Sequence, residues 1–167
     1  MKRPLWRTVG IGIPWLLLLF NPVFAAEDNC RYCGMRRSEF GYSWMVIPYD
    51  RGDPTSVCSV HCAVIDIVLN THRTIRDISV ADYNTHEQIQ AEKAFWVIGG
   101  DRLGVMTARA KWAFSTKAAA EDFIRRHGGR SASFEAVIQA AFEDMYQDTM
   151  MIQKKRRMMN SRKSDLQ

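Results

Sequence analysis

Sulfur-containing side chains are concentrated in two short segments of this chain. Residues 30–35 read Cys-Arg-Tyr-Cys-Gly-Met, and a second pair of thiols follows at Cys58 and Cys62, so these segments hold all four cysteines. Thiolate and thioether groups are soft ligands that select Cu(I), and thiolates alone also bind zinc. The sequence therefore predicts a soft-metal site to which both segments contribute.

The first segment combines two thiols with a thioether. Met35 follows Cys33 across the flexible residue Gly34, so the two sulfur atoms can converge on one ion. Ordinary packing of Met35 is the alternative reading of that residue. A disulfide between Cys30 and Cys33 would be strained and easily reduced, so it would stabilise the fold poorly. This favours a metal-binding or redox role for the pair.

The second segment places three candidate ligands at the start of a predicted helix. Cys58, His61 and Cys62 stand at positions i, i+3 and i+4, which share one face if the helix extends back to Cys58. The N-terminus of a helix lowers the pKa of nearby thiols and so favours thiolate. We therefore add these three residues to the predicted site.

Two other readings of the cysteines stay open at this point. The pairs resemble a structural zinc module, and Cys30 with Cys33 could serve a thiol–disulfide oxidoreductase, although no thioredoxin-type strand and helix surround them. Farther along, Met106 lies on a predicted loop after Gly104 and is either a further thioether ligand or part of the core.

The N-terminus has the pattern of an export signal. Basic residues precede an apolar run from Val9 to Phe20, and Val23-Phe24-Ala25 fits a cleavage site after Ala25. We expect residues 1–25 to be a signal peptide and the protein to work in the periplasm. No lipobox precedes Cys30, so lipidation is not expected there, and membrane association would require an uncleaved signal.

Charge and composition exclude several classes of function. The formal net charge is +5, but the positive charge comes from the predicted signal and from the Lys and Arg residues within 154–163. Residues 26–153, between these segments, are mildly acidic. There is no basic face of the kind that binds nucleic acid. The sequence also lacks a nucleophile–base–orienter set and a glycine-rich phosphate loop, so we do not expect an enzyme.

Hydrophobic periodicity predicts an α+β fold with an internal repeat. Two strand-strand-helix units are expected, and each places a capped helix after its second strand. The predicted strands and helices of these units are residues 42–49, 55–58 and 60–69, then 95–98, 111–114 and 117–127. We expect a small mixed or antiparallel sheet with the helices packed on it.

The remaining segments complete the predicted organisation. Residues 74–80 are expected to form a half-buried strand, and residues 134–151 an amphipathic C-terminal helix. The metal-binding domain is predicted to span residues 26–152, and the basic segment 153–167 is predicted to be disordered.

Several motifs together resemble the NosL family of periplasmic copper-binding accessory proteins, which are associated with assembly of the copper-sulfide centre of nitrous oxide reductase. The resemblance covers most of residues 30–134 and is carried by Cys33-Gly34-Met35, Gly104-Val105-Met106, Trp112-Ala113-Phe114-Ser115 and His127-Gly128-Gly129.

This resemblance implies Cu(I) held by sulfur and handed to a recipient cuproenzyme or copper-assembly protein. Position by position, it implies Cys33, Met35 and Met106 as the first ligands. The chain departs from the family in two respects: it lacks the usual lipobox, and it has Cys58, His61 and Cys62 where a serine and an arginine are usual. Zinc is the alternative metal for these extra thiols.

Overall fold

The computed structural model describes residues 29–164, so the predicted signal peptide lies outside the described part. Its strands form two antiparallel sheets, in the orders β2-β1-β3-β4 and β6-β5-β7. The first sheet contains β1 (Met45–Ile47), β2 (Thr55–Val57), β3 (Ser79–Ala81) and β4 (Gln88–Gln90). The second contains β5 (Phe95–Ile98), β6 (Lys111–Phe114) and β7 (Arg130–Ala132).

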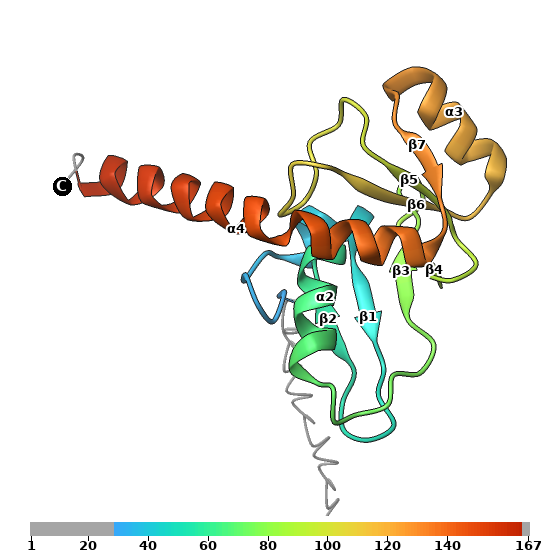
Figure 1. Ribbon diagram of the computed structural model, residues 1–167, viewed down its shortest axis with the longest axis horizontal. Coiled ribbons are helices and arrows are strands. Elements are labelled where there is room, and N and C mark those ends of the chain that lie inside the picture. Colours follow the sequence, from blue (N-terminus) through green and yellow to red (C-terminus); the bar gives the residue numbers. More distant parts are fainter. Residues whose placement is uncertain (1–28, 165–167) are drawn as a thin grey trace, which may run out of the picture.

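The predicted α+β fold and its two strand-strand-helix units are confirmed. The first unit ends in α2 (Val60–Leu69) and the second in α3 (Lys117–His127). Each helix follows the second strand of its unit. The Thr116 hydroxyl accepts a hydrogen bond from the Ala119 N–H and caps α3, whereas the Ser59 side chain makes no such bond at the start of α2. The strands differ from the expected arrangement in forming two sheets instead of one (Figure 1).

Two predicted strands are shorter in the structure. A one-turn helix α1 (Arg37–Phe40) leads into a 3₁₀ turn η1 (Gly41–Ser43), and this turn occupies the beginning of the segment expected to be a strand from residue 42. After Ile47 the ladder is interrupted by Pro48, which has no N–H to donate. Pairing resumes only as an isolated bridge between Tyr49 and Ile75, so the predicted strand at 74–80 is reduced to β3.

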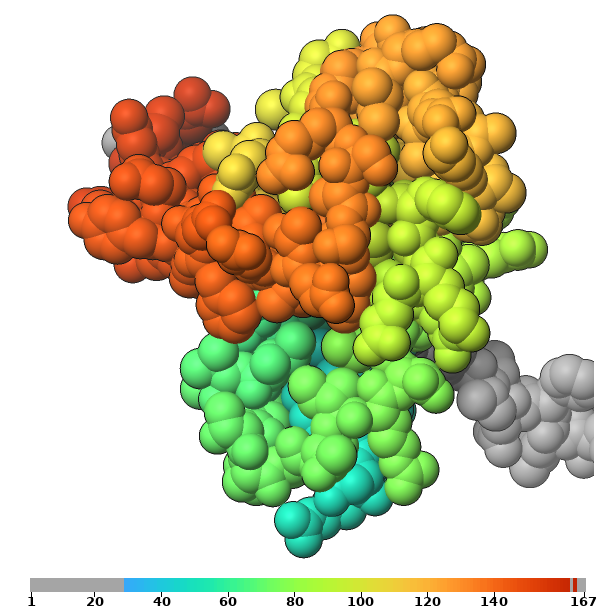
Figure 2. Space-filling model, turned by 45° about the vertical axis from the view of Figure 1, so that its right-hand side comes forward, coloured from blue at the N-terminus to red at the C-terminus, as the bar shows by residue number. Residues whose placement is uncertain are grey.

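The C-terminal helix α4 (Phe134–Ser164) connects the two halves of the molecule. It packs on α2, lies across the boundary between the first and second units, and projects beyond the body (Figures 1 and 2). The helix continues past its predicted end at Met151, so the basic segment expected to be disordered is helical through Ser164. Residues 150–164 contain no Gly or Pro and are rich in Met, Lys and Arg, which are good helix formers.

The buried core includes residues from both sheets and from the first part of α4. Trp44, Trp96, Phe114 and Phe123 are almost completely inaccessible to solvent. Tyr83, just after β3 of the first sheet, packs against the second strand-strand-helix unit. The centroid of its ring lies 5.0–5.7 Å from the ring centroids of Trp112, Phe114 and Phe123. Among residues 29–164 no helix is both long and apolar enough to cross a bilayer.

Asp82 forms a second, polar link, which joins the loop after β3 in the first sheet to the end of β6 in the second sheet. Its buried carboxylate accepts hydrogen bonds from the N–H groups of Asn84 and Thr85 in its own loop and of Ser115 after β6, at 2.6–2.9 Å. Burial alone would raise the pKa of Asp82, but these hydrogen bonds outweigh it and the pKa is lowered.

Acid should therefore destabilise the protein through Asp82. Because its pKa is lower in the folded than in the unfolded chain, the stabilisation is complete above about pH 4 and is lost as the pH falls through the folded value. We expect Asp82→Asn to cost about 1–2 kcal/mol at neutral pH and to weaken the pH dependence of stability below pH 4. Urea unfolding between pH 6 and pH 2.5 measures both effects. Asp77→Asn, at an exposed site, is the control, and an equal loss in both variants would contradict the role of Asp82.

Candidate metal centre

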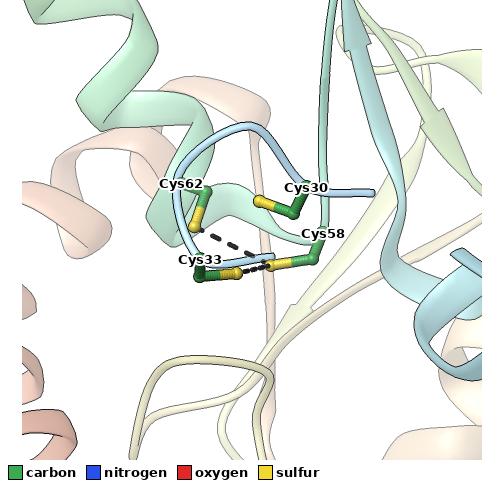
Figure 3. Close-up of side chains that lie close together, drawn as sticks. All are labelled: Cys30, Cys33, Cys58 and Cys62. Carbon is green, nitrogen blue, oxygen red and sulfur yellow. Dashed lines mark hydrogen bonds between the residues drawn. The ribbon is translucent and has the colours of Figure 1, made fainter. Parts of the chain in front are cut away.

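The four cysteine thiols meet at one place in the fold (Figure 3). Their Sγ atoms all lie within 4.8 Å of one another. Cys33 Sγ is 3.4 Å from Cys58 Sγ, and Cys58 Sγ is 3.7 Å from Cys62 Sγ. All four cysteines are free thiols. We call this set, Cys30, Cys33, Cys58 and Cys62, the thiol cluster.

A tight loop presents the first two thiols. The Gly34 N–H donates to the Cys30 carbonyl at 2.9 Å, and the Cys30 N–H donates to the Met35 carbonyl at 2.8 Å. Gly34 has φ +75°, in the left-handed region that favours glycine, which explains the Cys-Gly-Met sequence at this turn. The loop therefore turns both thiols toward the same point.

The strand-to-helix junction presents the other two thiols, as the sequence predicted. Cys58 follows the last residue of β2, and Cys62 lies in the first turn of α2, where the unpaired N–H groups and the helix dipole favour negative charge. The Ser43 hydroxyl donates to the Cys58 carbonyl at 2.7 Å and fixes the backbone of the junction.

Tyr32 and Asp66 fasten the first segment to α2, and the sequence reading missed both. The Tyr32 hydroxyl donates to Asp66 Oδ1 at 2.5 Å, and the Tyr49 hydroxyl donates to Asp66 Oδ2. Burial and this carboxylate raise the pKa of Tyr32 to about 12. The signal available in the sequence was a lone carboxylate, Asp66, within the otherwise apolar residues 63–69. The structure buries this carboxylate completely.

The close approach of the thiols makes their ionisation interdependent. Hydrogen bonds from Cys33, Cys58 and Cys62 hold the pKa of Cys30 far below its ordinary value. The pKa values of Cys58 and Cys62 are raised, first by their hydrogen bonding to Cys30. Hydrogen bonding to Cys30 raises the pKa of Cys33, but hydrogen bonds from Cys58 and Cys62 outweigh it and the pKa is lowered. The cluster thus favours thiolate at Cys30 and Cys33, and further thiolates need a cation to offset their repulsion.

The spacing of the sulfur atoms suits a soft metal ion. Four thiolates at about 2.3 Å from a tetrahedral metal lie about 3.8 Å apart. The separations of 3.4 and 3.7 Å are close to this value, and the remaining ones do not exceed 4.8 Å. Only small side-chain adjustments are therefore needed for the cluster to close on an ion.

Met35 and Met106 lie beside the cluster. Together with Cys33 they line a cavity of about 410 Å³, whose other walls include Tyr42 and the α4 residue Met151. Both methionines are half-buried, and Met106 adopts a positive φ of 60°, which turns the loop between β5 and β6 at this point. The structure thus brings the two predicted thioether segments, far apart in the chain, to the same cavity as Cys33.

The NosL family model matches residues 22–142, which is most of the chain. This protein belongs to the NosL family. The family resemblance inferred from the Cys33-Gly34-Met35 turn and the Met106 loop is confirmed. The match ends inside α4, so the last part of that helix lies outside the region that defines the NosL assignment.

A solved NosL structure supports the fold. The crystal structure described as the copper chaperone NosL from Shewanella denitrificans is 24% identical and superposes with a TM-score of 0.56. The similarity covers 68% of this chain and 91% of that one. No curated protein matches the sequence.

His61 is placed apart from the thiol cluster of this NosL protein. Its imidazole is buried against α4, with Nδ1 3.5 Å from Asp148 Oδ2, too far for a hydrogen bond. Burial lowers the pKa of His61, which favours the neutral ring. The residue lines a second cavity of about 190 Å³ with Cys33, Cys62 and Met106. It lies near the candidate sulfur ligands without joining the thiol cluster.

Carboxylates on α4 hold the loop that carries Met106, and sequence reasoning missed them as well. Asp148 Oδ1 accepts a hydrogen bond from the Ala108 N–H at 2.9 Å. Asp144 accepts from Arg109 Nε at 2.9 Å and from Lys111 Nζ at 2.8 Å. The only sequence signal was a pair of carboxylates four residues apart on a helix, which is common on solvated faces.

Proposed function

We propose that this protein is a periplasmic copper chaperone that binds Cu(I) through cysteine and methionine sulfur and delivers it to a cuproenzyme, with nitrous oxide reductase as the recipient. The observation that supports this most is the convergence of four free thiols within 4.8 Å, next to two thioethers at one cavity. Membership of the NosL family and the described role of the Shewanella denitrificans protein support the same function.

Cu(I) is the cargo, and sulfur ligands suit it. Thiolate and thioether groups are soft donors that prefer Cu(I) to hard cations. Cys33 supplies a thiolate, and Met35 and Met106 supply neutral thioethers from opposite segments of the fold. Cys30, Cys58 and Cys62 extend this ligand set on its buried side. His61 remains a proposed ligand only if its side chain turns away from Asp148.

Delivery requires that copper can leave as well as enter. The cavity beside Cys33, Met35 and Met106 gives a recipient ligand a route to the ion. An incoming thiolate or imidazole can replace one Cu–S(thioether) bond at a time, so copper stays monovalent and no electron is transferred. Residues of the loop at 103–106 form one wall of this route, and α4 forms another.

Zinc binding is the second candidate function, and the geometry of the thiol cluster favours it specifically. Closed tetrahedral sites of four cysteines are typical of structural zinc. A zinc module, however, has no use for Met35 and Met106. The methionines therefore distinguish the two functions.

Replacing either methionine should weaken copper binding. We expect Met35→Ala and Met106→Ala each to lower the affinity for Cu(I) by about 10-fold or more, because each removes one thioether ligand. Anaerobic titration of the reduced protein against a chromogenic Cu(I) chelator measures this change. Met150→Ala, an exposed methionine elsewhere on α4, is the matched control. Unchanged affinity in both test variants, with one equivalent of bound zinc, would contradict the proposal.

A further inference from the structure

We propose that the sulfur ligands form two adjacent Cu(I) positions that share Cys33. The outer position uses Cys33, Met35 and Met106, and the inner position uses Cys33 with Cys30, Cys58 and Cys62. This inference rests on the proposed function and adds to it a second, buried ion that exchanges with the first.

The two groups of ligands occupy different environments. Of the four thiols, only Cys33 lines the cavity of about 410 Å³ that contains Met35 and Met106. Cys30, Cys58 and Cys62 are 3%, 0% and 1% exposed, whereas Cys33 is half-buried. Copper that arrives through this cavity therefore meets the thioethers and Cys33 before it reaches the other thiols. Of these other thiols, Cys62 also lines the second cavity of about 190 Å³, together with Cys33 and Met106.

The number of sulfur ligands exceeds what one ion can use. Four thiols and two thioethers make a set of six, and tetrahedral coordination by sulfur uses four. A single ion in the thiol cluster would leave Met35 and Met106 without a role. A single ion at the outer position would leave three buried thiols without one.

Cys33 is placed to bridge the two positions. Its Sγ atom is 3.4 Å from Cys58 Sγ on the buried side, and the same residue forms part of the cavity wall on the other side. A thiolate has several lone pairs and can bind two soft cations at once. The bridge allows an ion to move inward by forming a bond to a buried thiolate while its bond to a thioether breaks.

Charge balance favours two ions over one. Four thiolates around one Cu(I) ion would leave three uncompensated negative charges in a largely buried site. A second Cu(I) ion removes one of them, and uncompensated buried charge is strongly unfavourable. Each ligand that is still a protonated thiol releases its proton to solvent when it binds, and both ions stay monovalent, so no oxidant or reductant is needed.

The number of bound copper ions tests the proposal. We expect the reduced, exported chain to bind two equivalents of Cu(I) with different affinities in an anaerobic chelator competition. The double variant Met35→Ala/Met106→Ala should retain only the tighter equivalent, and Cys58→Ser/Cys62→Ser only the weaker one. Met150→Ala should keep both. X-ray absorption of the wild-type protein with two equivalents should show a short Cu–Cu scattering path, and this measurement needs no variant to fold.

Other outcomes separate this inference from the proposed function. Saturation of the wild type at one equivalent would overturn the two positions and leave the copper chaperone function standing. Retention of two equivalents by the methionine double variant would also overturn them, because both ions would then be held by thiols alone. Failure of the reduced wild type to bind any Cu(I) would overturn the proposed function itself.

Discussion

Cys33→Ser should lower the affinity for Cu(I) by at least about 100-fold, the largest effect of any single substitution in the site. Removal of a group that only supports a metal ligand costs 10- to 100-fold, and this change removes a ligand itself. Cys33 is also the one member of the thiol cluster that lines the cavity with Met35 and Met106. Serine offers a hard oxygen in place of a soft sulfur, so size is nearly unchanged while ligand preference is lost.

Cys30→Ser is the informative comparison for this variant. It also removes one thiol of the cluster, but Cys30 does not line the cavity, so the proposed outer ligands Cys33, Met35 and Met106 remain. We expect a smaller loss of affinity than for Cys33→Ser, measured by the same anaerobic chelator competition. Equal losses would show that Cys33 has no special position. Urea unfolding of both metal-free variants checks that each is folded.

Asp144→Asn should cost about 3 kcal/mol of stability, the largest effect expected outside the sulfur ligands. Lys111 is almost fully buried, with 2% of its side chain exposed, and its ammonium lies 2.8 Å from Asp144. Removal of one partner leaves a buried charge without compensation, which costs more than the pair contributes. Burial alone would raise the pKa of Asp144, but hydrogen bonds from Arg109 and Lys111 lower it, so the carboxylate is ionised at neutral pH.

An exposed acid on another helix is the matched control for Asp144. Asp122 on α3 also pairs with two basic residues, Arg125 and Arg126, but 42% of its side chain is exposed. Asp122→Asn should cost less than about 1 kcal/mol, because solvent screens surface ion pairs. Urea unfolding of the metal-free proteins gives both values. Similar losses in the two variants would show that burial of Lys111 does not determine the energetics at this site.

Local sequence patterns predicted the part of the site that depends on local structure. The apolar spacing after Ser59 indicated a helix, and residues 55–58 indicated a strand, so the position of Cys58 and Cys62 at their junction followed; in the structure the strand ends at Val57. Gly34 indicated the turn that presents Cys33. The family resemblance added Met106, which periodicity alone could not distinguish from a core methionine.

Contacts between distant segments could not be predicted in the same way. The short strands do not specify their partners, so a single sheet was expected where two form. Pro48 was visible in the sequence, but its effect depended on the strand that pairs beside it. The carboxylates Asp144 and Asp148 were read as part of an ordinary amphipathic helix, because nothing near them in the sequence indicates that they hold the Met106 loop.

Competition between copper and zinc tests the proposed function most directly. The reduced, metal-free protein is offered equal amounts of Cu(I) and Zn²⁺ under anaerobic conditions, and the bound metals are measured by elemental analysis after desalting. The combination of thiolates with Met35 and Met106 predicts that copper is retained and zinc is excluded. Retention of one equivalent of zinc with no copper would contradict the function proposed for this protein.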